Sequence, residues 1–226
     1  MTSREETLTR IRQSLRTGVL PAAQNNGQPT MEAPAIDQAA LIASFVREAQ
    51  AGGAEVFQPG THSEAEETLI DVLKQAGQQA ITWADEALPI ANVRELLFRA
   101  GITRHVPDLA RDPLMRRQQW HNLDNVRVGI TGALGGLADT GSIIVASGRH
   151  RSRAASLLPE THIALLPSDR LYPTMQAFFA APSAQELTEN ASNLVFITGP
   201  SRTADIEMII TRGVHGPKRL CIVLLP

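Results

Sequence analysis

The spacing of apolar residues along the chain switches repeatedly between a helical period and short continuous runs. After Asp37, a predicted N-cap, apolar residues return every three or four positions until Gly52-Gly53. This spacing predicts a helix with one buried face. The residues expected on that face are Leu41, Ile42, Phe45, Val46 and Ala49.

The same period predicts further helices downstream. One begins at a capping box of Ser63 and Glu66 and ends at Gly77. Another covers residues 93–99, and a last one is expected to begin near Thr203, between the final two strands.

Short apolar runs separate these helices and are typical of buried strands. They read AEVFQ, AITW, VRVGIT, SIIVAS, HIALL, NLVFIT and RLCIVLL. Because strands alternate with helices, the sequence predicts an α/β fold with a mixed, mostly parallel sheet flanked by helices. Between residues 126 and 166 three strand patterns follow one another without a clear helix, so antiparallel or mixed pairing is expected there.

The first 34 residues differ from the rest of the chain. Leu8, Ile11 and Leu15 form one apolar stripe and predict a short helix. The stretch LPAAQNNGQPTMEAPA is poor in large apolar residues and predicts a flexible linker. We therefore predict two parts: residues 1–34, an N-terminal helical extension with its linker, and residues 35–226, an α/β domain.

Composition and charge narrow the function classes. The hydrophobic content of 43% and the charged content of 19% are typical of a globular protein. A formal net charge of -2 gives no attraction to nucleic acid or to an anionic membrane. The opening residues lack the apolar core of a secretory signal, and no apolar stretch reaches the ~20 residues that span a bilayer. We expect a cytoplasmic protein without a nucleic-acid or membrane partner.

Metal and cofactor motifs are missing from the sequence. The single cysteine, Cys221, lies in the apolar run LCIVLL, where a buried structural thiol is expected. The six histidines have no H-x-x-x-H or H-x-x-E-H spacing. The glycine-rich residues 132–147 match neither G-x-G-x-x-G nor a phosphate-binding loop ending in lysine. We therefore predict no metal and no cofactor.

The turn TGPSRTADIE, residues 198–207, is the strongest candidate site. Because it follows a strand and precedes a predicted helix, its backbone amides and the helix dipole are expected to attract an anion. Arg202 offers a guanidinium that can clamp a carboxylate or phosphate. The predicted ligand-binding residues of this turn are Gly199, Ser201, Arg202, Thr203 and Asp205.

The spacing of the two acids in this turn limits its chemistry. A helix that buries Ile206, Ile209 and Ile210 places Asp205 and Glu207 on opposite flanks, so they cannot act as a close carboxylate pair. The alternative interpretation is that the hydroxyl and carboxylate side chains simply cap the helix.

Candidate acid–base groups are Asp139, Glu207 and His215, the last in the turn RGVHGP. Asp139-Thr140-Gly141 has the letters of an aspartic-protease tripeptide, but that chemistry needs two carboxylates, and only one copy is present. Thr140 is kept as a ligand-binding candidate. The alternative is a glycine-rich hairpin in which Asp139 and Thr140 bond to their own backbone.

Three alternating arginines form another candidate anion site, in SGRHRSR. Arg149, Arg151 and Arg153 are expected on one side of an extended segment, where they can hold an anionic ligand or the acidic surface of a partner. The alternative is a solvated loop.

The stretches ADTGSIIV, SLLPETHIALLP and TGPSRTADIEMIITRGVHGPKRLCIVLL, in this order, resemble the LUD-domain proteins, specifically the lactate utilisation protein C (LutC/YkgG) family. The resemblance covers residues 126–226 well, and the N-terminal third only in general layout. It implies a fold similar to the NagB/RpiA/CoA-transferase-like class. It also implies a role, with two partner proteins that carry iron–sulfur clusters, in the bacterial oxidation of L-lactate to pyruvate. No catalytic residue is carried over from the family.

The first hypothesis is therefore a component of a lactate-oxidising system that binds a small carboxylate or another anion, such as lactate or pyruvate, at residues 198–207. Two alternatives stay open. One is a free-standing transferase, ligase or isomerase acting on a phosphorylated or CoA-linked substrate. The other is a non-catalytic assembly factor that docks through its N-terminal helix. The sequence shows no autonomous redox motif and does not decide whether the chain is an enzyme by itself.

Overall fold

The computed structural model describes residues 4–10, 37–107, 112–182, 184, 188, 191–204, 210–213 and 215–226, without the side chains of residues 203, 204 and 210–212. The chain divides into two units, residues 1–36 and 37–226. In the first unit, residues 4–10 are helical and exposed, and the predicted partners Ile11 and Leu15 lie outside the described residues.

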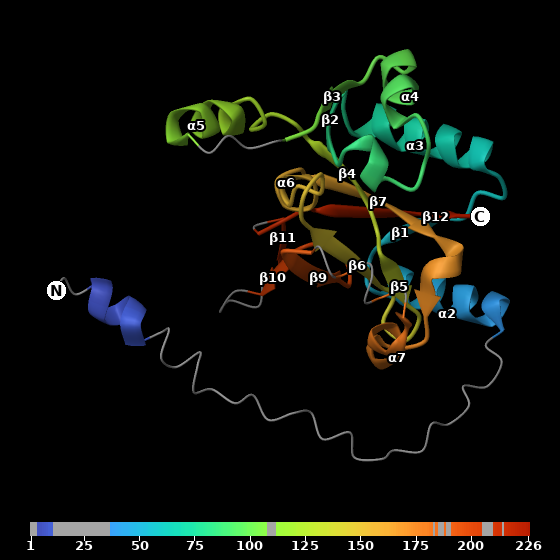
Figure 1. Ribbon diagram of the computed structural model, residues 1–226. Helices are drawn as coiled ribbons and strands as arrows, with labels where there is room; N and C mark the ends of the chain where they lie inside the picture. The colour runs from blue at the N-terminus through green and yellow to red at the C-terminus, as the bar shows by residue number, and fades with distance from the viewer. Residues whose placement is uncertain are drawn as a thin grey trace. The chain divides into compact units, whose positions relative to one another are not determined.

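The second unit contains the following elements (Figure 1). Its helices are α2 (Gln38–Ala51), α3 (His62–Ala76), η1 (Asp85–Ala87), α4 (Val93–Arg99), α5 (Pro113–His121), α6 (Ala154–Leu157), η2 (Ser168–Arg170) and α7 (Met175–Ala180). Its strands are β1 (Glu55–Phe57), β2 (Gln79–Thr82), β3 (Thr103–His105), β4 (Val128–Gly132), β5 (Gly135–Leu137), β6 (Ser142–Ser147), β7 (Thr161–Pro167), β8 (Leu171–Tyr172), β9 (Asn193–Ile197), β10 (Arg202–Ala204), β11 (Ile210–Arg212) and β12 (Arg219–Leu225).

A six-stranded sheet forms the centre of this unit, in the order β1-β12-β7-β4-β2-β3. Every neighbouring pair in it is parallel. Strands β4, β7 and β12 are buried over almost their whole length, because both faces of the sheet are covered. Figure 1 shows α3 and α4 on one side of this sheet and the second sheet on the other. The predicted α/β fold with a mostly parallel sheet is confirmed.

The second sheet has the order β8-β5-β6-β9 and mixed pairing. Strand β6 pairs antiparallel with both β5 and β9, whereas β5 and β8 are parallel. The expected mixed pairing between residues 126 and 166 is therefore confirmed. Strands β4 and β7 from this region join the parallel sheet, and β5 and β6 form a hairpin in the second sheet.

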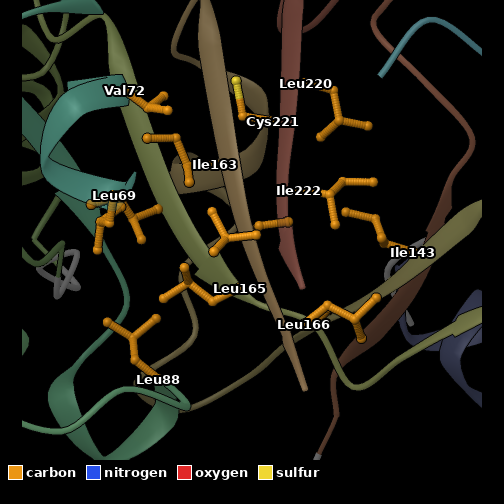
Figure 2. Packing of buried hydrophobic residues seen from close by; sticks show 14 of the residues in the cluster. Leu69, Val72, Leu88, Ile143, Ile163, Leu165, Leu166, Leu220, Cys221 and Ile222 are labelled. Atoms are coloured by element: carbon orange, nitrogen blue, oxygen red, sulfur yellow. The ribbon is translucent and has the colours of Figure 1, made fainter. Parts of the chain in front are cut away.

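Apolar side chains fill the space on each side of the parallel sheet. Leu69 and Val72 of α3 lie against Ile163 of β7 on one side, and Ile143 of β6 lies near Ile222 on the other (Figure 2). The two sets come from alternate positions of the strands, as the period of two requires. The core therefore joins both sheets into one body.

Two buried titratable side chains lie within this core. Burial lowers the pKa of His162 to about 4, and a ring nitrogen of His162 lies 2.8 Å from the Thr131 hydroxyl. Burial also raises the pKa of the Cys221 thiol to about 12. The prediction of a buried structural thiol at Cys221 is confirmed.

Local signals located the ends of α2 and α4. The Asp37 carboxylate accepts a hydrogen bond from the Ala39 amide at 3.0 Å, and α4 covers the predicted residues 93–99. The capping box of α3 was predicted two residues too late. The Thr61 hydroxyl, not that of Ser63, accepts from the Glu64 amide at 3.2 Å, because Thr61 is the last residue with an extended backbone.

The predicted helix beginning near Thr203 is wrong. Residues 202–204 and 210–212 form strands β10 and β11, which pair antiparallel, with Thr203 opposite Thr211. Residues 205–209 lie outside the described residues. β-Branched residues are frequent here, and they favour strands over helices.

Candidate functional site

The segment from residue 148 to residue 157 contributes side chains to two cavities. It begins where β6 ends, at Ser147, and turns tightly: Gly148 and Arg151 exchange backbone hydrogen bonds at 3.1 Å. His150, inside this turn, has a φ of 64°, which is uncommon for a residue other than glycine. The turn therefore reverses the chain just before α6 begins.

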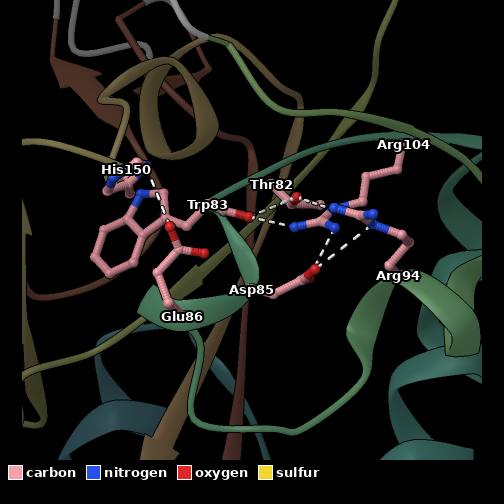
Figure 3. Close-up of polar contacts among 7 residues, drawn as sticks. All are labelled: Thr82, Trp83, Asp85, Glu86, Arg94, Arg104 and His150. Carbon is pink, nitrogen blue, oxygen red and sulfur yellow. Dashed lines mark hydrogen bonds and ion pairs between the residues drawn. The ribbon is translucent and has the colours of Figure 1, made fainter.

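Two hydrogen bonds fasten this turn to the loop that follows β2. The Ala84 amide donates to the His150 carbonyl at 3.0 Å, and the Trp83 indole donates to the Ser152 carbonyl at 3.2 Å. Figure 3 shows His150 beside Trp83 and Glu86, with the His150 Nδ1 atom 3.3 Å from the Glu86 carboxylate. The loop after β2 and the turn after β6 are thus held together.

The arginine cavity lies at this junction, with a volume of about 380 Å³. Its wall includes the residues just after the carboxyl ends of the parallel strands β2 and β4, which is where open α/β sheets bind ligands. Its ionisable residues are Glu86, Arg149, His150, Arg151 and Arg170. Its remaining wall is mostly apolar: Trp83, Ala87, Leu88, Pro89, Gly132, Ala133 and Leu134.

Positive charge dominates the arginine cavity. Among the described residues, the guanidinium groups of Arg149, Arg151 and Arg170 have no hydrogen bond or ion pair. Glu86 is the only acid among the described residues of the wall, and it faces His150. The cavity therefore presents three guanidinium groups against one carboxylate, which favours an anion.

A nearly buried arginine holds the loop after β2 in place (Figure 3). The Arg104 side chain is 9% exposed and donates to the Thr82 hydroxyl at 2.6 Å and to the Trp83 carbonyl at 2.7 Å. Its guanidinium also lies 2.7 Å from the Asp85 carboxylate, and Arg94 lies 3.6 Å from the same carboxylate. These contacts fix the backbone that carries Trp83 and Glu86.

The hydroxyl cavity is the second of the two, with a volume of about 230 Å³. Its polar side chains are Ser147, Arg153, Ser156, Thr198, Ser201 and His215. Its apolar wall comes chiefly from β6, β9 and the end of α6. Arg153 and His215 are exposed, and neither has a partner among the described residues. This cavity therefore combines one guanidinium and one imidazole with several hydroxyl groups.

A chain of hydroxyl groups leads away from the hydroxyl cavity. The Thr198 hydroxyl lies 2.8 Å from that of Ser142, which lies 2.8 Å from that of Thr140. Ser142 is buried, so its hydroxyl depends on these two neighbours. The chain fixes the Thr198 side chain at the cavity wall.

The structure brings together some of the predicted site residues and separates others. Gly199, Ser201, His215 and Arg153 all line the hydroxyl cavity. Thr140 reaches it only through the hydroxyl chain, and Arg151 lies in the arginine cavity. Asp139 is exposed and lines neither cavity. Asp205 and Glu207 lie outside the described residues, as does the side chain of Thr203.

Two premises of the predicted anion turn are corrected. The turn follows β9, which pairs antiparallel with β6 in the second sheet, so it does not lie at the end of a parallel strand. It leads into β10 rather than into a helix start, and the Ser201 amide donates to the Pro217 carbonyl at 2.8 Å. The dipole of a helix at Thr203 therefore contributes nothing here.

Arg202 has a structural contact instead. Its guanidinium donates to the Gly52 carbonyl at 2.8 Å, at the C-terminus of α2. A cation there complements the negative end of the helix. Gly53 allows this approach, since a Cβ atom on Gly53 would lie 2.3 Å from the Arg202 Nη2 atom.

The expectation that three arginines share one side holds for two of them. Arg149 and Arg151 line the arginine cavity, whereas Arg153 lines the hydroxyl cavity. The tight turn at His150 and the start of α6 at Ala154 separate them. Sequence reasoning missed Arg170 and Glu86, although each follows shortly after the carboxyl end of a strand, β7 and β2 respectively.

The described ranges contain neither a membrane-spanning helix nor a cluster of metal-ligating side chains. No helix there has the length and apolar character needed to cross a membrane. The same part of the chain contains no group of three His, Cys, Asp or Glu side chains placed to hold a metal ion.

Comparison with known proteins identifies the family. The LUD domain matches residues 23–225. Lactate utilization protein C of Halalkalibacterium halodurans is 30% identical over 178 residues, which cover 73% of this chain and 74% of that protein. The uncharacterized protein YkgG of Escherichia coli K12 is 27% identical over 73% of this chain and 71% of its own length.

A solved structure agrees in fold. The crystal structure of a DUF162 family protein from Deinococcus radiodurans superposes with a TM-score of 0.58 and 21% identity, covering 84% of this chain and 99% of that one. Because the domain match spans most of the sequence and the relatives align over most of their length, the chain belongs to the LUD domain family.

Proposed function

We propose that this protein acts in L-lactate utilisation and binds a small carboxylate, such as L-lactate or pyruvate, in the hydroxyl cavity. In this proposal it works with two partner proteins that carry iron–sulfur clusters and transfer the electrons. Relatives named lactate utilization protein C support the lactate role. The observation that carries the binding site is the convergence of Arg153, Ser201 and His215 on one cavity.

The charges of the cavity suit a monocarboxylate. Among the described residues of its wall, Arg153 carries the only guanidinium, which can donate two parallel hydrogen bonds to a carboxylate. The hydroxyl groups of Ser201 and Thr198 can donate to the ligand, and the hydroxyl chain to Thr140 orients Thr198. A larger anion with several charges would leave charge unpaired in this cavity.

His215 is the candidate acid–base group of this site. Its imidazole can accept a proton from the 2-hydroxyl of a bound 2-hydroxy acid or donate one to a keto oxygen. No redox step is assigned to this chain. Its assigned tasks are to bind the carboxylate, orient the 2-position and exchange one proton.

Calorimetric titration with L-lactate and with pyruvate tests the binding site. We expect heat with at least one ligand in the wild type, and binding at least about tenfold weaker in Arg153→Gln, which loses charge-assisted hydrogen bonds. Arg117→Gln, at an exposed position in α5, is the matched control and is expected to bind like the wild type. No heat with either ligand would refute carboxylate binding.

Growth on L-lactate tests the physiological role separately. Cells that lack this gene are expected to lose growth on L-lactate and to keep growth on glucose. Wild-type protein restores growth, and Arg153→Gln restores it poorly at equal protein level. Normal growth of the deletion strain on L-lactate would contradict the role, whatever the calorimetry shows.

A further inference from the structure

We propose that the arginine cavity is a second ligand site, and that it binds a phosphate monoester with a compact apolar body. This site is separate from the hydroxyl cavity, so the inference does not depend on lactate binding. Three guanidinium groups converge here from two segments: Arg149 and Arg151 from the turn after β6, and Arg170 from η2 after β7.

The wall of the arginine cavity carries an excess of positive charge. Lining positions contribute three guanidinium groups and one carboxylate, in a protein whose formal net charge is -2. No acid among the described residues pairs with the three guanidinium groups, since Glu86 faces His150. Like charges gathered without a protein partner repel one another, so a bound dianion relieves this repulsion. A phosphate monoester supplies close to two negative charges and three acceptor oxygens.

Hydrogen bonds hold the wall of the arginine cavity in place before any ligand binds. The turn that carries Arg149 and Arg151 is fastened to the loop after β2 by the Ala84 and Trp83 hydrogen bonds. That loop is in turn fixed by Arg104. The left-handed backbone of His150 is an uncommon conformation, and such residues gather at ligand sites. A fixed wall lowers the entropy lost when a ligand binds.

The volume of the arginine cavity and the polarity of its wall suit a small ester. A volume of about 380 Å³ lies within the range of roughly 300–1,000 Å³ typical of small-molecule sites. The guanidinium groups are accompanied by apolar carbon from Ala87, Leu88, Pro89 and Leu134. An inorganic phosphate would leave this apolar wall uncovered, whereas an ester places a carbon body against it.

Titration with phenyl phosphate, followed by calorimetry and by thermal unfolding, tests the site. Phenyl phosphate is expected to bind the wild type and to raise its melting temperature. The double variant Arg151→Gln/Arg170→Gln is expected to bind at least about tenfold more weakly, because it loses two charge-assisted contacts. Arg149→Gln is a second variant for the same titration, and it is expected to fold normally because Arg149 is exposed. Arg117→Gln is the matched control.

The outcomes separate this proposal from the previous one. We expect the Arg151→Gln/Arg170→Gln protein to bind L-lactate with the affinity of the wild type. We also expect the wild type to bind inorganic phosphate more weakly than phenyl phosphate. The proposal is overturned if phenyl phosphate does not bind, or if the double variant and Arg149→Gln both bind it like the wild type. Inorganic phosphate or citrate binding as tightly as phenyl phosphate would also overturn the assignment of an ester.

Discussion

The two cavities receive neighbouring residues of one segment, yet they differ in chemistry. The arginine cavity gathers Arg149, Arg151 and Arg170 at the edge of the parallel sheet, whereas the hydroxyl cavity pairs a single guanidinium with hydroxyl groups beside the second sheet. A two-residue step along the chain, from Arg151 to Arg153, is enough to change cavity. A tight turn therefore gives one short segment two binding surfaces of different charge.

The first prediction, which has the largest expected effect, concerns the contact between β4 and α6, the helix at the end of the segment that lines both cavities. Gly129 of β4 lies directly under α6, and a Cβ atom there would lie 1.7 Å from the Ala155 carbonyl oxygen. Gly129→Ala is expected to reduce the free energy of unfolding by about 3 kcal/mol, because backbone must move. Urea unfolding measures it.

Gly60→Ala is the control for this change, since its nearest neighbour is the end of the flexible Glu64 side chain at 3.4 Å. If Gly129→Ala unfolds within 1 kcal/mol of the wild type, on the scale of roughly 1–3 kcal/mol for overpacking, α6 is not held as described.

The second prediction concerns His162 in β7, a strand of the parallel sheet whose strand β4 contributes to the wall of the arginine cavity. His162 has a folded pKa of about 4, below its unfolded value near 6.5, so the unfolded chain binds the proton more readily between these pH values. Stability is therefore expected to fall as the pH drops from 6.5 to 4, by up to about 3 kcal/mol. Denaturant unfolding of wild type and His162→Gln at several pH values measures the difference.

The loss attributed to His162 is distinct from that of Glu55. Hydrogen bonds from Arg219 lower the pKa of Glu55, so its contribution is lost only as the pH falls below about 4.5. If the free energy of unfolding changes between pH 6.5 and 4.5 equally in the wild type and in His162→Gln, the folded protein binds a proton at His162 as readily as the unfolded chain does, which would contradict this prediction.

The third prediction sharpens the identity of the hydroxyl cavity. Ser201→Ala removes one donor from its wall and is expected to weaken L-lactate binding about fivefold, the equivalent of about 1 kcal/mol. Phenyl phosphate binding is expected to stay unchanged. Equal weakening of both ligands would show that the cavities do not act separately.

The fourth and smallest effect concerns Arg202, which the sequence placed at the centre of the anion turn. Because its exposed guanidinium donates to the Gly52 carbonyl, Arg202→Ala is expected to lower stability by about 0.5–1 kcal/mol. L-Lactate affinity, measured by calorimetry, is expected to remain that of the wild type. A large loss of affinity in a stable Arg202→Ala protein would return this residue to the binding site.

The parallel sheet was predictable because its signal is local. After their first residues, His162 and Arg219, the runs HIALL and RLCIVLL are apolar at every position, which is typical of a strand buried on both faces. Asp37 likewise marked the start of α2 by its own side-chain chemistry. Strand β3 and helix α5 were not predicted; α5 has no buried residue among those described, so it lacks the strong apolar stripe that marks α2.

The candidate site was predictable only in part, because it depends on contacts distant in sequence. Ser201, His215 and Arg153 were singled out separately, and only the fold places them in one cavity. The helical period in residues 203–210 suggested a helix, but pairing of β10 with β11 overrides it. Arg170 belongs to no sequence motif. It lines the arginine cavity because it follows β7, which lies beside β4 in the parallel sheet.

Titration of L-lactate into the wild type, Arg153→Gln and Arg151→Gln shows which cavity binds the carboxylate, because these two substitutions remove the same group from different cavities. We expect wild-type affinity in Arg151→Gln and affinity at least about tenfold lower in Arg153→Gln. Absence of lactate binding by the wild type, or equal losses in the two variants, would contradict this expectation.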